Sequence, residues 1–190
     1  ATGRGATGAH PAAESAAELP GQSPAAETAP VAMPPVWEGR PVTMLRAALS
    51  SASQSADPRV LARALDVVVE KTRLFGGRVE AIEGATLTAA FGVSSAADAG
   101  SRALLAALAI VKAGERYEAD RGLKVSVSIA AHTARALVRR DSGNPEISPG
   151  DTAEIAAVLD DLLASAEPNT VLASGAVTPL LGRHFRVERL

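Results

Sequence analysis

Few residues of this 190-residue chain have side chains that could do chemistry. Cysteine is absent, which excludes a disulfide, a thiol nucleophile and a thiolate metal site. Three histidines are present, and His132, in the run Ala131-His132-Thr133, has no second histidine or cysteine close to it in the sequence. We therefore predict a half-buried or exposed turn histidine there, and a histidine-rich metal centre is not expected.

A second candidate is the run Gly150-Asp151-Thr152, which could begin a helix whose N-terminal amides bind a phosphate. An acidic residue at that point disfavours an anion, and Asp151 and Glu154 have the spacing of a capping box. We therefore predict that these two residues begin a helix that runs to about Ser165. The charged runs Arg139-Arg140-Asp141 and Asp160-Asp161 are predicted to be solvated.

Composition excludes several classes of partner. Hydrophobic residues make up 47% of the chain, which allows a sizeable core. Lysine and arginine number 19 against 21 acidic residues, and this balance argues against a nucleic-acid clamp or a polybasic membrane binder. No apolar run reaches the roughly 18 residues that a spanning helix requires. We predict no nucleic-acid partner and no membrane contact by this segment.

The first part of the chain differs from the rest. Of residues 1–38, 21 are alanine, proline or glycine, and large apolar residues are few. Such a segment cannot bury enough surface to offset its ordering entropy, so we predict a flexible linker over 1–38 and one domain over 39–190. Because the chain begins with Ala1 and not methionine, we expect it to be part of a longer protein.

The domain alternates strand and helix patterns. Helices are predicted from Pro58 to the Gly76-Gly77 stop, from Ser95–Asp98 to about Gly122, and from Asp151 to Ser165. The hairpin spacing and the alternation of apolar residues indicate an α+β fold, with an antiparallel-rich sheet and helices on one face. The predicted strands are 41–49, 78–82, 86–91, 125–131, 134–140, 171–173 and 185–189. Of these, 134–140 is the predicted hairpin partner of 125–131.

Three stretches resemble the class III adenylate/guanylate cyclase homology domain. Gly76–Gly92 (GGRVEAIEGATLTAAFG) is similar to the family hairpin G-G-r-v-x-K-x-x-G-D-g-x-l-a-x-F-G. Val127–Val138 (VSIAAHTARALV) and Gly150–Leu159 (GDTAEIAAVL), followed by Pro168–Ser174 (PNTVLAS) and Phe185, resemble the later family motifs in the same order. The resemblance implies the nucleotide cyclase fold, a ferredoxin-like βαββαβ core with added strands.

The family's metal-binding aspartates are replaced by alanine. In that family a ribose 3′-hydroxyl attacks an α-phosphate between two metal ions, which two aspartates hold. The first lies in a pattern like V-T-v-L-F-a-D, which corresponds to Val42–Ala48 and places Ala48 at the aspartate. The second corresponds to Ala85, after Gly84. A methyl group cannot bind a hard cation, and Glu83 alone is predicted to be a solvated turn residue. We therefore expect no metal and no cofactor.

The other family positions also differ. The base-recognising lysine corresponds to Ala81 and the second base-selecting residue to Ser148. The ribose-positioning asparagine corresponds to Glu154 and the transition-state arginine to Val158, which cannot stabilise phosphate charge. No catalytic residue is therefore expected at any of the six positions.

The sequence thus predicts a catalytically inactive cyclase-homology domain, a regulatory or dimerisation module of a larger, bacterial-style signalling protein in the cytoplasm. Because family members pair head to tail, we expect a homodimer or an intramolecular partner domain, and family habit suggests a protein kinase upstream. One alternative is a domain that binds a nucleotide or second messenger without turnover. A less favoured one is an active cyclase with rearranged ligands.

Overall fold

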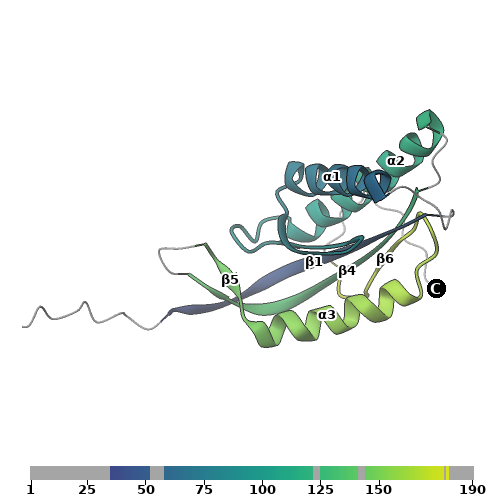
Figure 1. Ribbon diagram of the computed structural model, residues 1–190. Helices are drawn as coiled ribbons and strands as arrows, with labels where there is room; N and C mark the ends of the chain where they lie inside the picture. The colour runs from purple at the N-terminus through teal and green to yellow at the C-terminus, as the bar shows by residue number, and fades with distance from the viewer. Residues whose placement is uncertain (1–34, 52–57, 122–124, 141–143, 178, 180–190) are drawn as a thin grey trace, which may run out of the picture. The chain divides into compact units, whose positions relative to one another are not determined.

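The computed structural model describes residues 35–51, 58–121, 125–140, 144–177 and 179. Strands and helices alternate through this part of the chain (Figure 1). The elements are β1 (Trp37–Ser51), α1 (Pro58–Leu74), β2 (Arg78–Glu83), β3 (Thr86–Phe91), α2 (Ala99–Arg121), β4 (Val125–Arg139), β5 (Glu146–Ile147), α3 (Pro149–Ala164) and β6 (Val171–Ala173).

The described strands form one sheet in the order β2-β3-β1-β4-β5, with β6 also paired to β4. The β4–β6 pairing is parallel and the other pairings are antiparallel. In the β2-β3-β1-β4 core, each strand–helix–strand connection passes over one intervening strand, as in a ferredoxin-like βαββαβ unit. The predicted α+β class and antiparallel-rich sheet are confirmed.

Helices cover both faces of the sheet, so the expectation of helices on one face is wrong. Along β1, side chains alternate between the two faces. Leu45, Ala47 and Leu49 pack in the cluster that contains α1 and α2, whereas Val42 and Met44 pack with Ile155 and Leu159 of α3. Figure 1 shows α1 and α2 on one side of the sheet and α3 on the other. The run Val42–Leu45 is buried without interruption because both of its faces are covered.

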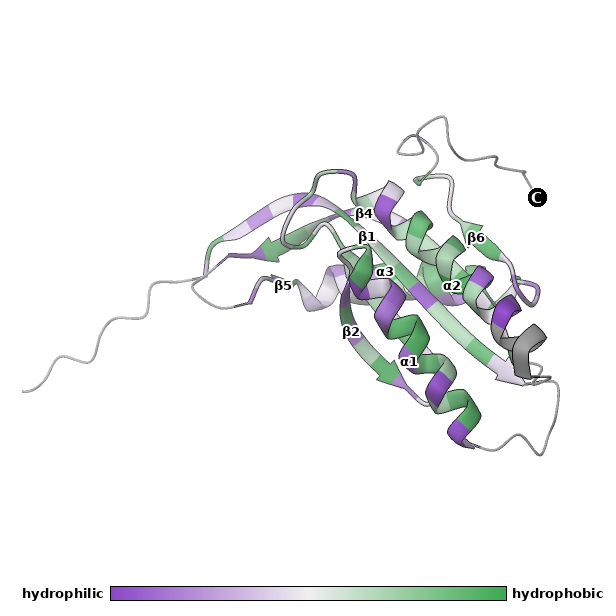
Figure 2. Ribbon diagram, turned by 90° about the horizontal axis from the view of Figure 1, so that it is seen from above, coloured by the Kyte–Doolittle hydropathy of each residue, from purple (hydrophilic) through white to green (hydrophobic). Residues whose placement is uncertain are grey.

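The packing of α2 on the sheet depends on alanine. Ala103, Ala106 and Ala107 are fully buried, which lets the helix approach the strands closely; Figure 2 shows α1 and α2 from above. The spacing of Leu104, Leu108 and Val111 in the sequence predicts one apolar face on this helix, but Leu108 is 42% exposed. Its place is taken by Ile110, because the buried stripe of a helix follows a 3.6-residue period.

β4 is one continuous strand, so the predicted hairpin between 125–131 and 134–140 is wrong. All fifteen of its residues pair with β1, including His132 with Met44. The run contains no glycine, proline, asparagine or aspartate that would favour a turn. His132 is therefore a mid-strand residue and not a turn residue.

β1 begins at Trp37, two residues before the predicted domain boundary and four before the predicted strand. Pro41 lies outside the stretch Thr43–Ala48 that pairs with β3, so its missing N–H removes no bond on that side. Most of the predicted linker and the predicted strand at 185–189 lie outside the described residues. Among the helices described, none is long and apolar enough to cross a membrane.

Candidate functional site

Ala48 and Ala85 lie on neighbouring strands. Ala48 of β1 pairs with Thr86 of β3, and the Leu49 N–H donates to the Ala85 carbonyl at 2.9 Å. The β2–β3 turn that places Ala85 contains Gly84 with a φ of 59°, a conformation that glycine adopts without strain. The backbones at the two positions that the resemblance assigns to metal-binding aspartates are therefore adjacent, and both positions carry methyl groups. Their side chains lie on opposite faces of the sheet, because Ala85 packs with the α1 cluster whereas Ala48 is opposite Thr86 on the other face.

Small and hydroxyl-bearing side chains surround Ala48 on its face of the sheet. This face continues the one that packs against α3. Ser50 and Ser126 share a hydrogen bond at 3.0 Å between their Oγ atoms, and Ser128 Oγ donates to the Glu167 carbonyl at 3.1 Å. We call it the distal face; it consists of Arg46, Ala48, Ser50, Thr86, Thr88, Ser126 and Ser128.

Arg46 is the charged residue of the distal face. Its Nε donates to Thr88 Oγ1 at 3.1 Å, and its guanidinium forms an ion pair with Asp160 of α3. The side chain thus joins β1, β3 and α3. The sequence analysis did not identify Arg46 as a candidate. A signal was available, because the family pattern has phenylalanine where this chain has arginine.

The remaining assigned positions lie on other elements. Ala81 is on the edge strand β2, opposite Thr88 and beside a register shift. Ser148, Glu154 and Val158 are all at or on α3, with Glu154 exposed. Within this chain, the structure therefore places the six positions in separate groups.

The start of α3 differs from the predicted capping box. The N-cap is Ser148, whose side chain accepts from the Asp151 N–H, and the helix begins at Pro149. Asp151 instead accepts from the Leu137 N–H at 2.7 Å, which fixes the helix to β4. Proline at the first helical position explains the earlier start, because its ring presets the helical φ. Glu154 therefore has no part in the cap.

A mainly apolar groove of about 370 Å³ lies beside Ala85. Its lining contains no carboxylate and comprises Pro58, Leu61, Ala62, Leu65, Gly84 and Ala85. Within the described residues, no three His, Cys, Asp or Glu side chains are grouped to hold a metal ion. The methyl groups of Ala48 and Ala85 and the Arg46 guanidinium offer no oxygen ligand. The residues at these positions therefore do not fit the two divalent cations that the resemblance implies.

The arrangement of strands and helices is similar to that of solved cyclase domains. The adenylyl cyclase CyaB from P. aeruginosa is 14% identical, with 76% of this chain and 82% of that chain covered and a TM-score of 0.64. The guanylate cyclase domain of RhGC from Catenaria anguillulae, in complex with GTP, is 13% identical, with 77% of this chain and 85% of that chain covered and a TM-score of 0.62. The chain has the nucleotide cyclase fold.

An adenylate/guanylate cyclase/hydrolase from Silicibacter pomeroyi is 23% identical, with 75% of this chain and 80% of that chain covered and a TM-score of 0.53. No protein-family model and no curated protein matches the sequence. The resemblance read from the motifs is thus confirmed for the fold. Identities this low carry no conclusion about activity, because one fold hosts many functions.

His132 lies within the cyclase fold at the junction of β4 and β6. Its Nδ1 is 2.7 Å from Ser174 Oγ, and the Ser174 N–H donates to the Ala131 carbonyl at 3.0 Å. Burial lowers the pKa of His132 because it disfavours the charged imidazolium. This histidine fastens the parallel pair of strands, which is a structural role.

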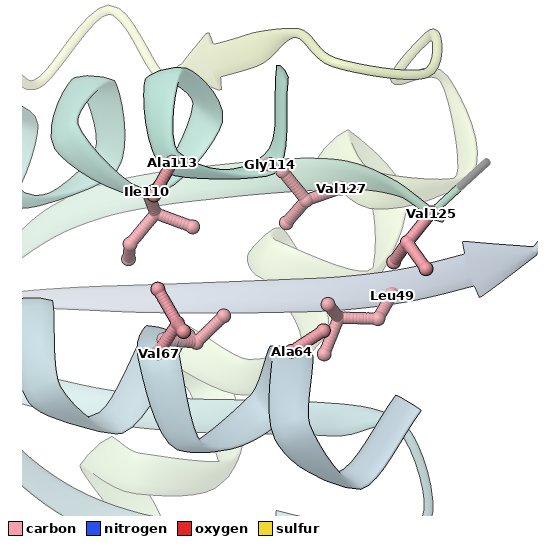
Figure 3. Close-up of a pocket in the computed structure, with 9 residues that line it drawn as sticks. Leu49, Ala64, Val67, Ile110, Ala113, Gly114, Val125 and Val127 are labelled. Atoms are coloured by element: carbon pink, nitrogen blue, oxygen red, sulfur yellow. The ribbon is translucent and has the colours of Figure 1, made fainter. Parts of the chain in front are cut away.

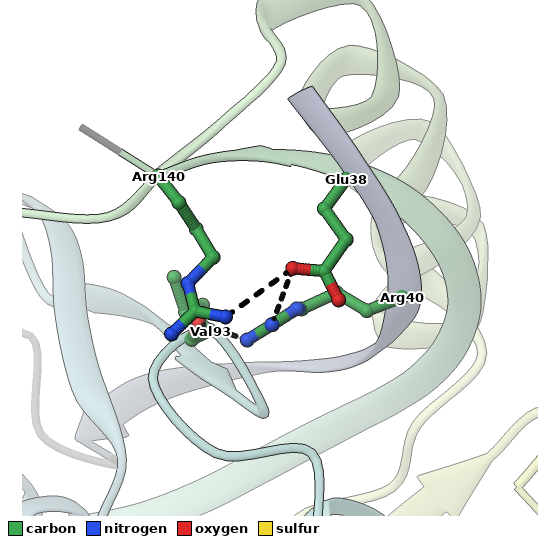
Figure 4. A network of polar contacts seen from close by, with 4 residues as sticks. All are labelled: Glu38, Arg40, Val93 and Arg140. Carbon is green, nitrogen blue, oxygen red and sulfur yellow. Dashed lines mark hydrogen bonds and ion pairs between the residues drawn. The ribbon is translucent and has the colours of Figure 1, made fainter. Parts of the chain in front are cut away.

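A cluster of charged side chains holds the N-terminal end of β1 (Figure 4). Glu38 Oε2 accepts from Arg40 Nη2 at 2.9 Å and from Arg140 Nη1 at 3.5 Å. The hydrogen bond from Arg40 is the main cause that lowers the pKa of Glu38. Arg40 Nη1 also donates to the Val93 carbonyl at 2.9 Å, which ties β1 to the β3–α2 loop.

The cyclase fold also contains an apolar cavity between α1, α2 and the ends of β1 and β4 (Figure 3). Its volume is about 20 Å³, room for about one water molecule. Side chains such as Leu49, Ile110 and Val127 line it with carbon, so it is a packing gap and is too small for a nucleotide.

Proposed function

We propose that this chain is a catalytically inactive domain of the nucleotide cyclase fold, which acts as a regulatory or dimerisation module of a larger signalling protein in the cytoplasm. One observation carries the proposal. Ala48 and Ala85 are backbone neighbours across β1 and β3, and neither side chain has an oxygen that could hold a cation. Two-metal phosphoryl chemistry requires such ligands on both ions.

The positions on α3 support the same conclusion. Val158 stands at the place that the resemblance assigns to a transition-state arginine, and an arginine that stabilises phosphoryl charge contributes about 10³–10⁵ in rate. Glu154 stands at the ribose-positioning place and adds negative charge, which disfavours a triphosphate. Each replacement acts against catalysis independently of the missing carboxylates.

A regulatory or pairing role follows from what the chain retains. The packed sheet and its three described helices remain, whereas the six positions that the resemblance assigns to the chemistry carry other residue types. Trp37 of β1 and Leu137 of β4 are exposed large apolar residues. We assign these two side chains to the proposed pairing surface. We propose a second copy, or another domain of the same protein such as a protein kinase, as the partner.

A second candidate function is binding of a nucleotide or second messenger without turnover. The groove beside Ala85 favours it, because about 370 Å³ of carbon-lined space could accept a base. An active cyclase with rearranged ligands is the third candidate. Glu83, which is exposed at the end of β2, would then have to act as a ligand.

The decisive experiment incubates the purified chain with ATP or GTP and Mn²⁺ and measures cyclic nucleotide by mass spectrometry. We expect no product above a protein-free control, while an active cyclase in the same buffer gives product. Formation of cyclic AMP or cyclic GMP by this chain contradicts the proposal.

Two further measurements separate the remaining functions. A thermal shift with a nucleotide panel tests the binding function, because a ligand that binds the folded state alone raises stability. Sedimentation tests the pairing function. Only monomer at tens of micromolar, together with no partner domain bound, contradicts the dimerisation role.

A further inference from the structure

Two leucines of α2 are exposed side by side. Leu105 and Leu108 are each 42% exposed, and they are neighbours because residues three apart lie on the same side of a helix. Leu104, one turn before Leu108, is buried. The two exposed leucines therefore lie at the rim of the buried face of α2, as apolar surface that the described part of the chain leaves open.

The described part of the chain ends beside this surface. Val177 is fully buried and packs with Leu104 of α2 and Ala131 of β4. Pro179, two residues later, is the last residue that the structure describes. Leu104 and Leu108 are separated by about 6 Å along the helix axis. The residues that follow Pro179 therefore start close to the exposed leucines.

The strand β6 has a free edge next to the same surface (Figure 2). Among the described strands, β6 pairs with β4 alone. The Thr170 carbonyl and the Ser174 N–H each form a 3.0 Å bond to β4. Because the backbone groups of successive strand residues point to opposite sides, those of Val171 and Ala173 point away from β4. An extended segment that lies there can pair with them.

We propose that residues 180–190 cover the exposed leucines of α2 and lie along the free edge of β6. The segment reads LLGRHFRVERL. Phe185 and Val187 alternate with charged residues, so the segment, when extended, presents both to the same side. Its extended length of about 35 Å is more than enough to reach from Pro179 past Leu108. Phe185 and Val187 are the side chains that we assign to the contact with α2.

This inference goes beyond the proposed function and holds whether or not the chain is an enzyme. While residues 180–190 lie on α2, that face is closed to a partner domain. Pairing through α2 therefore requires the segment to leave it, whereas pairing through the surface that contains Trp37 and Leu137 does not.

The absence of cysteine makes thiol labelling a direct test. Leu108→Cys places a single thiol on the exposed side of α2, and the rate of its reaction with a neutral maleimide is measured in the full chain. Adding Phe185→Ser/Val187→Ser is expected to raise this rate at least about fivefold, because the thiol loses its cover. Ala157→Cys is the matched control, on an exposed position of α3 on the other face of the sheet. Its rate should change less than about twofold.

A crosslink identifies the segment that covers the leucines. Leu108→Cys/Val187→Cys is treated with a short bismaleimide, which tolerates small differences in register. We expect a crosslink within one chain, located by mass spectrometry, and none in Ala157→Cys/Val187→Cys. This measurement keeps Phe185, so it decides the inference even if Phe185→Ser/Val187→Ser unfolds the chain, which circular dichroism detects.

Three results overturn the inference. The first is an equal labelling rate of Leu108→Cys with and without Phe185 and Val187. The second is crosslinking of Ala157→Cys as readily as of Leu108→Cys. The third is a crosslink that joins two chains, which shows that a second copy and not the chain's own segment covers α2. Cyclic nucleotide formation contradicts the proposed function and leaves this inference standing.

Discussion

The Nδ1 atom of His132 lies 2.7 Å from the Oγ atom of Ser174, so one side-chain contact joins the middle of β4 to the residue that follows β6. Only three residue pairs make up the parallel β4–β6 ladder. The side-chain contact at the end of this short ladder therefore adds to the backbone bonds that hold β6 in place.

We predict that the free energy of unfolding falls as the pH is lowered through the region below 6.5, the ordinary pKa of histidine. Burial lowers the pKa of His132 in the folded state, so the unfolded chain binds the proton more readily. Stability from this group is complete above 6.5 and is lost as the pH falls through the lowered pKa. Urea unfolding at a series of pH values measures the effect.

The variant His132→Gln is the control for that titration. It keeps a polar group but cannot titrate, so its free energy of unfolding should depend less on pH between 7 and 5. An unchanged pH dependence in His132→Gln assigns the effect to other groups and contradicts the prediction.

Asn169 provides a second test of how β6 is held. Its φ is 59°, and its Oδ1 accepts from the Val127 N–H at 3.0 Å. Both Asn169→Gly and Asn169→Ala lose the hydrogen bond. The glycine variant also removes the Cβ from the left-handed region, whereas the alanine variant keeps a Cβ there without the polar side chain that lets asparagine adopt this φ, which costs about 1–2 kcal/mol. We expect the alanine variant to be less stable than the glycine variant by about 1 kcal/mol in chemical denaturation. Equal stabilities contradict the strain argument.

Much of the fold could be predicted from local patterns, and the errors have physical causes. The glycine stop at 76–77, the turn at Gly84 and the strand run of β3 each depend on neighbouring residues, and these elements were predicted correctly. The length of β4 was not predicted correctly. Whether the chain turns or continues at His132-Thr133 depends on its pairing with β1, which is not a local property of the sequence. The side of the sheet that α3 covers is likewise decided by tertiary packing.

The candidate site was predicted in part for a similar reason. The motif spacing assigned Ala48 and Ala85 to the two positions, and their backbones are adjacent across β1 and β3. That their side chains lie on opposite faces of the sheet follows from the strand pairing, which the spacing does not show. Ser148 as the N-cap and Arg46 as a link to Asp160 were missed. The Ser148 cap was a local signal, because Ser148 precedes Pro149 and accepts from the Asp151 N–H three residues later. The Arg46–Asp160 ion pair joins residues far apart in the sequence, about which local spacing carries no information.

Gly114 offers a stabilising substitution. It lies inside α2 at the wall of the apolar cavity, and a Cβ added there would meet Val127 Cγ1 at 3.6 Å, an ordinary contact. Gly114→Ala should raise the free energy of unfolding by about 1 kcal/mol, because alanine favours the helix and fills part of the gap. Gly92→Ala is the opposite control, since its φ is 94° and the added Cβ would lie 2.8 Å from the Pro41 carbonyl. No stabilisation by Gly114→Ala contradicts the prediction.

The two arginines that share Glu38 are predicted to contribute unequally, although both contact the same carboxylate. Arg40 is 11% exposed and also donates to the Val93 carbonyl, so Arg40→Met leaves a partly buried carbonyl without that donor. We expect a loss of about 1–3 kcal/mol, the cost of an unsatisfied buried group. Arg140 is 62% exposed and its contact is longer, so Arg140→Met should cost below about 0.5 kcal/mol. Raising the salt concentration should remove the Arg140 effect, because exposed charges are screened, and leave most of the Arg40 effect. Urea unfolding of the two matched variants at low and high salt measures both, and equal losses would show that the shared carboxylate, and not the bond to the β3–α2 loop, is what Arg40 contributes.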